Sequence, residues 1–199
     1  MRRGAALFLV LGLGGIARAE SAGFAREFQA GVDAFRLGKL DLARAHLERA
    51  KELEPKLPGP SRFLAAVAHA QGRWIDCVGA ARLALAQNPR SSERLDTRKL
   101  HERCRSSAGR PAYGGDLGER AAIAVTTSVP GAAVRIGGLG YGGTPVAPRP
   151  IEPGALAVEI AKRGFYPVRV EIEALPGIVT DVVVELVAEP EAPASAGAR

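Results

Sequence analysis

The chain has 199 residues, a formal net charge of +6 and 47% hydrophobic residues. This length is sufficient for one ordinary domain or two small ones. Arg2 and Arg3 precede an apolar stretch that closes with the small-x-small pattern Ala17-Arg18-Ala19, so residues 1–19 are predicted to be a cleaved signal peptide. Their removal takes away three arginines and lowers the formal charge from +6 to +3. The remaining basic residues alternate with acidic ones, and we therefore expect no nucleic-acid partner.

The apolar run from Ala5 to Leu13 is too short to span a bilayer of about 30 Å, and no second candidate follows it. We therefore expect no transmembrane segment after cleavage, although an uncleaved interfacial anchor is an alternative. The predicted location is secreted, in the periplasm or cell envelope of a bacterium.

Residues 20–106 are predicted to form a helical domain, because apolar residues recur at helical spacing and proline stands only at helix boundaries. The stretch repeats with a period of 34 residues. The positions that match across this period are Gly38 and Gly72, Pro55 and Pro89, Ala50 and Ala84, and Leu40 and Trp74.

On these positions the stretch resembles the tetratricopeptide repeat, which has a helix, a tight turn and a second helix in each unit. In residues 24–55, Gly31 takes the place where two helices approach and Leu47 that of the bulky packing residue. Residues 58–89 depart from the pattern at three positions, and these departures allow the two helices of this unit to pack in a slightly collapsed pair. The differing positions are Ala65 for the first glycine, Cys77 for the usual alanine and Ala81 for the bulky residue. A third helical segment, SSERLDTRKLHERCRSS, would cap the stack.

The resemblance implies a binding scaffold whose ligand lies in a groove lined by the first helix of each unit. Carried over to this sequence, the partner-binding groove is predicted at Phe28, Val32, Phe35, Arg36, Arg62, Ala66 and His69. The alternative is that Phe28 and Phe35 only pack under the end of the domain that lies nearest the signal peptide.

Cys77 and Cys104 are the only cysteines. An even number in a secreted chain favours a disulfide, which would tie the second helix of the second unit to the capping helix. The alternative is that both are small buried apolar residues.

Residues 107–120 are rich in glycine, charge and turn formers without a period, so they are predicted to be a linker. Beyond them the apolar period changes to two, and five or more short strands separated by Gly and Pro turns predict a small all-β antiparallel sandwich over residues 121–188. The last segment, residues 189–199, has no apolar period and is predicted to be disordered.

Gly138, Gly140 and Gly143 form the pattern G-x-G-x-x-G after a predicted strand. A dinucleotide fingerprint needs a helix that begins at this loop, but TPVAPRP follows, and its prolines exclude such a start. We therefore expect no dinucleotide and assign these glycines to turns.

The segment IAVTTSVPGAAVRIGGLGYGGTPV, followed by RGFYPVRVEI, resembles the PEGA domain. Pro130-Gly131-Ala132 corresponds to the turn that gives the family its name, Gly143-Thr144-Pro145 to its G-T-P element, and residues 164–167 to its G-aromatic-x-P turn. The extra glycines around Tyr141 depart from the usual short hairpin, and Tyr141 is predicted to be an exposed contact residue in a mobile loop.

His46, His69 and His101 are well separated on predicted helices, and no metal-ligand spacing, nucleophile elbow or acid pair is evident. The sequence therefore predicts no catalytic, cofactor-binding or metal site. Both resemblances imply a non-enzymatic adaptor of the cell envelope, with the repeats binding a protein partner and the β domain docking to the envelope. The alternative is a module that binds peptidoglycan or surface polysaccharide through the β domain, with the repeats as a spacer.

Overall fold

The computed structural model describes residues 14–87 and 91–190. The chain divides into two compact units, Met1–Thr97 and Arg98–Arg199. Helices come first and strands second, as predicted, but the division falls inside a helix rather than after residue 106. Residues 1–13 of the predicted signal peptide, Pro89, and residues 191–199 of the predicted disordered tail lie outside the described residues.

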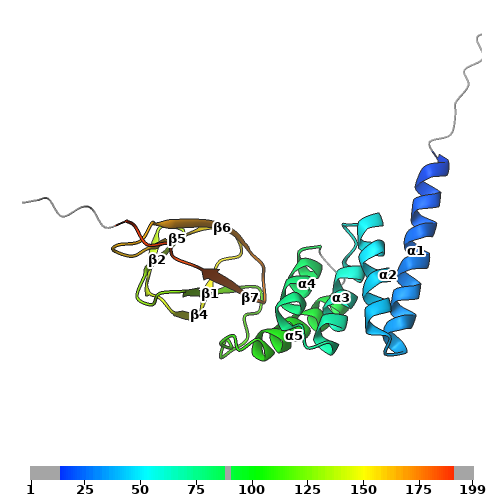
Figure 1. The fold of residues 1–199 in the computed structure, drawn as a ribbon, viewed down its shortest axis with the longest axis horizontal. Coiled ribbons are helices and arrows are strands. Elements are labelled where there is room, and N and C mark those ends of the chain that lie inside the picture. Colours follow the sequence, from blue (N-terminus) through cyan, green and yellow to red (C-terminus); the bar gives the residue numbers. More distant parts are fainter. Residues whose placement is uncertain (1–13, 88–90, 191–199) are drawn as a thin grey trace, which may run out of the picture. The chain divides into compact units, whose positions relative to one another are not determined.

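The predicted helical region contains five helices among the described residues (Figure 1). Within the described ranges, no helix has the length and apolar character needed to cross a bilayer. The capping helix has the bounds expected from the sequence. The helices are α1 (Gly14–Arg36), α2 (Leu40–Leu53), α3 (Pro58–Ala70), α4 (Trp74–Ala86) and α5 (Ser91–Ser107).

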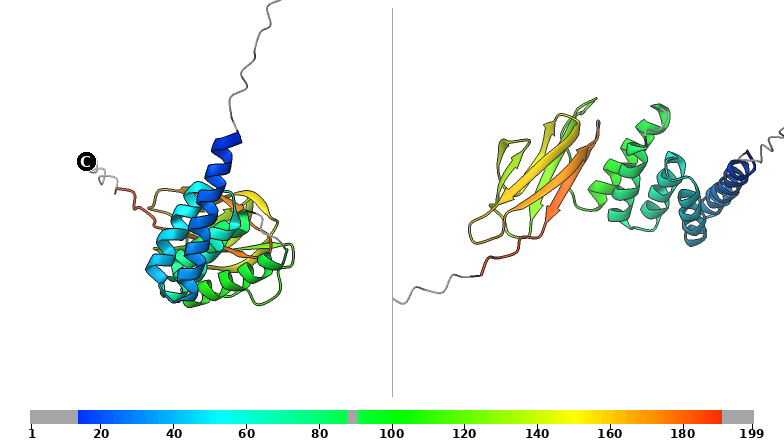
Figure 2. Two further views of the ribbon diagram at one scale, coloured as in Figure 1. Left: turned by 90° about the vertical axis from the view of Figure 1, so that its right-hand side faces the viewer. Right: turned by 90° about the horizontal axis from the view of Figure 1, so that it is seen from above.

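The first four helices form two successive hairpins that repeat in geometry as well as in sequence (Figure 2). Gly38 and Gly72 both adopt φ +71°, the left-handed conformation that ends a helix. The amide of Lys39 donates to Ala34 O at 2.9 Å, and the residues 34 positions later repeat this bond at 2.8 Å. The period of 34 is therefore a true structural repeat of one helix, a tight turn and a second helix.

Small residues allow the two helices of the first hairpin to approach closely. A Cβ atom at Gly31 would lie only 2.7 Å from Leu47 Cγ and 3.3 Å from the carbonyl oxygen of Ala43. Leu47 and Ala43 are fully buried. In the second hairpin, the position equivalent to Gly31 holds Ala65 and the position equivalent to Leu47 holds Ala81, and both are fully buried. The larger side chain at the first position is therefore accompanied by a smaller one at the second.

A carboxylate and an imidazole join the same two helices. The Nδ1 atom of His46 on α2 lies 2.7 Å from Glu27 Oε2 on α1. This hydrogen bond lowers the pKa of the Glu27 carboxyl from its usual range.

Up to residue 190, where its description ends, the second unit contains seven strands in two sheets that face each other, which confirms the predicted sandwich (Figure 1). One sheet has the order β4-β1-β7 and the other the order β3-β2-β5-β6. The core between them comes from alternating residues such as Ile123, Val134 and Ile160. The strands are β1 (Ala121–Thr127), β2 (Ala133–Ile136), β3 (Leu139–Gly143), β4 (Val146–Ile151), β5 (Gly154–Ala161), β6 (Val168–Ala174) and β7 (Val179–Val184).

One strand pair departs from the predicted antiparallel arrangement. Strand β7 runs parallel to β1, with Ala122 opposite Val179 and Thr127 opposite Val184, whereas the other four pairs are antiparallel. Parallel neighbours require a crossover between distant segments, and here the crossover passes through the other sheet. Alternation along the sequence predicts a strand but carries no information on its direction.

The segment predicted as a linker, residues 107–120, contains turns but covers the outer face of one sheet. Tyr113 and Leu117 pack against a cluster of Ala122, Ala124 and Val179. Both faces of β1 are therefore covered, which explains its continuous run of buried residues. This segment belongs to the β unit.

Arg105 attaches the end of α5 to strand β7. Its side chain is completely buried and donates to both carboxylate oxygens of Asp181, at 2.8 and 2.9 Å. It also donates to Glu102 and to the carbonyl oxygen of Pro111. Burial alone would lower the pKa of the guanidinium, but the hydrogen bonds and charge of Asp181 raise the pKa above its usual value.

Candidate functional site

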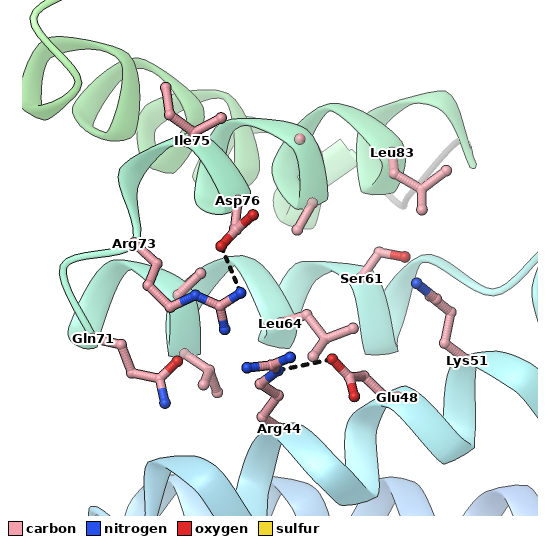
Figure 3. Close-up of a pocket in the computed structure, with 14 residues that line it drawn as sticks. Arg44, Glu48, Lys51, Ser61, Leu64, Gln71, Arg73, Ile75, Asp76 and Leu83 are labelled. Carbon is pink, nitrogen blue, oxygen red and sulfur yellow. Dashed lines mark hydrogen bonds and ion pairs between the residues drawn. The ribbon is translucent and has the colours of Figure 1, made fainter.

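A hollow of about 350 Å³ opens on the helical unit between α2 and α4, with α3 as its floor (Figure 3). Its lining combines apolar and charged side chains, a combination suited to a peptide rather than to a purely apolar ligand. The residues that line it are Arg44, Glu48, Lys51, Ser61, Leu64, Val67, Ala68, Gln71, Arg73, Ile75, Asp76, Gly79, Ala80 and Leu83.

Helical geometry explains both the floor and the open space above it. Leu64 and Ala68 lie one turn apart on the same side of α3 and form part of the floor. Across from them, α4 presents Gly79 and Ala80, and a Cβ atom at Gly79 would meet nothing within 4 Å. The small residues of α4 therefore leave the space unfilled.

Two large apolar side chains on the α4 side of the hollow are unusually exposed. Ile75 is 62% exposed and Leu83 is 41% exposed. Single exposed apolar residues are common, but these two flank a concave surface with an apolar floor. The arrangement offers apolar area to a bound chain.

Most charges around the hollow are already paired with each other. Arg44 Nε lies 2.8 Å from Glu48 Oε1, and Arg73 Nη2 lies 2.6 Å from Asp76 Oδ2, as Figure 3 shows. The hydrogen bond to Glu48 raises the pKa of the Arg44 guanidinium. Lys51 also lines the hollow, and within the described residues it forms no ion pair.

Ser61 is a polar residue in a mainly apolar part of the floor. It is 1% exposed, and its Oγ atom has no hydrogen-bond partner among the described residues. At the other end of α3, Gln71 donates through Nε2 to Asp41 at 2.8 Å, while its Oε1 atom is also without a described partner. Unsatisfied buried polar atoms are rare in folded proteins and require an explanation.

The predicted groove residues on α1 serve mainly to pack the helices together. Phe28 lies edge-on to Phe63 of α3 with ring centroids 5.6 Å apart, and Phe35 meets the same ring at 6.1 Å. Val32 is buried, while Arg36 is exposed and pairs with Asp33. Phe28 and Phe35 thus pack against a neighbouring helix, as the alternative of a packing role expected, and their partner is Phe63.

The predicted groove residues on α3 lie on the side of the helix opposite the hollow. Arg62 forms an ion pair with Glu93 at 3.3 Å, and His69 lies edge-on to Trp74 with centroids 5.3 Å apart. At about 100° per residue, Arg62, Ala66 and His69 point roughly opposite to the residues of α3 that line the hollow. None of the seven predicted groove residues lines this hollow.

The prediction for Tyr141 was wrong in its structural part. Tyr141 lies in strand β3 and packs, half-buried, against the core of the sandwich, rather than standing exposed in a mobile loop. The hairpin before it turns through Gly137 and Gly138, both with positive φ, as a two-residue turn requires. The extra glycines extend a strand, and no helix follows them.

The turns of the β unit that contain Pro130-Gly131-Ala132 and Gly143-Thr144-Pro145 are hydrogen-bonded to each other. The amide of Gly131 donates to the carbonyl oxygen of Thr144 at 2.7 Å, and the amide of Ala132 donates to the hydroxyl of Thr144 at 3.1 Å. Tyr166 donates its amide to the carbonyl oxygen of Val187, which attaches the last segment of the unit. These motifs act first as folding devices.

Both cysteines are disulfide-bonded, which confirms the predicted bond between Cys77 and Cys104. The two residues are fully buried. In the ranges that the structure describes, no group of three or more His, Cys, Asp or Glu residues is placed to hold a metal ion.

The two-sheet sandwich with its paired turns defines a small β module that follows a helical repeat unit. Residues 120–190 match the family described as the PEGA domain. The match covers the β strands and confirms this part of the resemblance. A search of curated proteins finds none that matches the chain.

Proposed function

We propose that the protein is a non-enzymatic adaptor of the bacterial cell envelope. In this proposal the helical unit is a tetratricopeptide-like scaffold that binds a partner protein, and the PEGA-like unit docks to the envelope. The repeat geometry of the two hairpins supports the scaffold, and the disulfide supports an oxidising compartment such as the periplasm.

The observation that carries the proposal is the hollow between α2 and α4, with Ile75 and Leu83 exposed beside it. A concave surface with an apolar floor and charged side chains is suited to an extended segment of another protein. This surface replaces the one expected from the sequence, because the aromatic residues there are used in packing against Phe63.

The test uses the full mature chain, residues 20–199, as bait in an envelope extract, with bound proteins identified by mass spectrometry. We expect the wild-type chain to retain a protein that is lost with Ile75→Glu. The matched control is Leu37→Glu, because Leu37 is 69% exposed and lies outside the hollow. Neither change fills a buried position, so both variants should fold.

The proposal would be overturned if the chain retained no protein and instead sedimented with purified cell wall, and if neither variant changed that sedimentation. That result would favour the polysaccharide-binding module, with the repeats as a spacer.

A further inference from the structure

Lys51 and Ser61 mark one end of the hollow, and we propose that they bind the carboxylate of an acidic residue in an extended partner segment. The inference rests on the proposed function, because it names the chemistry of the segment that would occupy the hollow. Figure 3 shows Lys51, Ser61 and Leu83 at one end, and Gln71 and Arg73 at the other.

The hydroxyl of Ser61 is the first reason. A buried hydroxyl without a hydrogen bond destabilises a folded protein, so a residue of this kind is normally replaced by alanine or given a partner. Ser61 has no described partner, although it lines a hollow that a ligand can enter. A hydroxyl donates one hydrogen bond, and a carboxylate oxygen is a strong acceptor for it.

The uncompensated charge of Lys51 is the second reason. The two carboxylates that line the hollow already form ion pairs, Glu48 with Arg44 at 2.8 Å and Asp76 with Arg73 at 2.6 Å. The ammonium of Lys51 is therefore the charged group of the lining that can pair with a ligand. Ser61 also lies in the first turn of α3, where the helix dipole favours a negative charge. Both features select an anion.

The dimensions of the hollow select a peptide. Ser61 lies in α3 and Gln71 is the residue that caps its C-terminal end, ten residues later, which corresponds to about 15 Å along the helix axis. An extended chain advances about 3.3 Å per residue, so four or five residues fill this length. Between the polar ends lie Leu64, Ala68 and the exposed Ile75, which favour apolar side chains next to the acidic one.

The first experiment measures binding of the disulfide-bonded chain, residues 20–199, to an array of pentapeptides with acetylated N-termini and amidated C-termini. We expect the bound peptides to be enriched in Asp or Glu at one end. Changing that residue to Asn or Gln should weaken binding about ten-fold or more, because a charge-assisted hydrogen bond is lost.

Variants then assign the carboxylate to its partners. Lys51→Ala and Ser61→Ala should each weaken the acidic peptide but leave its amide counterpart unchanged. The matched control is Lys56→Ala, because Lys56 is exposed and does not line the hollow. Ser61→Ala should also melt at the same temperature as the wild type or higher, because it removes an unsatisfied buried hydroxyl.

Two results would overturn this inference while leaving the proposed function intact. One is a set of bound peptides without acidic preference whose binding is still lost with Ile75→Glu. The other is a marked fall in the melting temperature of Ser61→Ala, which would show that the hydroxyl has a structural partner. If instead Ile75→Glu retains the same proteins as the wild type, the proposed function itself fails.

Discussion

Replacing Arg105 by alanine tests whether the end of α5 is part of the β unit. The change removes two hydrogen bonds to Asp181, the contact with Glu102 and the bond to the carbonyl of Pro111. Because the side chain of Asp181 is only 13% exposed, its carboxylate is then left mostly buried without a cation.

Breaking a buried ion pair by removal of one partner typically costs about 3–5 kcal/mol. We take the lower end, about 3 kcal/mol, since Asp181 retains some contact with solvent. For a domain of this size each kcal/mol lowers the melting temperature by about 4–8 °C, so Arg105→Ala should melt about 12–24 °C below the wild type.

The assay is thermal unfolding of residues 20–199, followed by circular dichroism in the β-sheet region. Arg103→Ala is the matched control, because Arg103 lies on the same helix and is exposed. The double variant Arg105→Met with Asp181→Leu should recover much of the loss, since it removes both buried charges. Equal melting temperatures for Arg105→Ala and Arg103→Ala would refute the reasoning.

Three further predictions concern stability. Gly31→Ala should lower the stability of the helical unit in urea unfolding, because the new Cβ atom would lie 2.7 Å from Leu47 and overpacking costs about 1–3 kcal/mol, more than the helix-propensity gain of about 1 kcal/mol. Gly79→Ala should raise the stability, because its Cβ atom would meet no atom within 4 Å. Cys77→Ser should lower stability by about 3 kcal/mol, and alkylation of two thiols in the unreduced protein would contradict the bond. The hydrogen bond from His46 lowers the pKa of Glu27, so the stability that this carboxylate contributes is complete above the usual pKa of a glutamate and is lost as the pH falls through the lowered pKa. The difference in melting temperature between wild type and Glu27→Gln should therefore shrink on acidification.

Local features of the fold were predictable because a few neighbouring residues determine them. Gly38 and Gly72 end helices in the left-handed conformation, and their spacing of 34 residues predicted two hairpins of equal geometry. The alternating residues of β5 and β6 predicted strands for the same reason. Each signal lies within one turn or one strand.

The hollow could not be predicted because α3 is apolar on both sides. Phe63 faces the aromatic residues of α1, while Leu64 and Val67 face the hollow, and periodicity does not show which side is covered. The resemblance to the tetratricopeptide repeat placed the binding groove on the side of α3 that faces away from the hollow. The one local signal for the hollow was Ser61, a hydroxyl in an apolar helix, whose burial is visible only in the structure.

The boundary of the β unit shows why a family match and a folding unit differ. The match begins at residue 120, but three residues that lie before it contact residues within it. Arg105 donates to the carboxylate of Asp181, and Tyr113 and Leu117 pack against the apolar cluster around Val179. A fragment that starts at residue 120 exposes the cluster around Val179 and leaves Asp181 without its cation.

We therefore predict that a fragment of residues 120–199 binds a hydrophobic dye and unfolds with low cooperativity, because it lacks both the cover of its outer sheet and the buried cation. A fragment of residues 98–199 carrying Cys104→Ser, which the division of the chain defines as compact, should unfold cooperatively at a higher temperature. Arg105→Ala in the longer fragment should remove much of that advantage. Equal melting temperatures for the two fragments would show that the strands alone suffice, and α5 would then belong to the helical unit only.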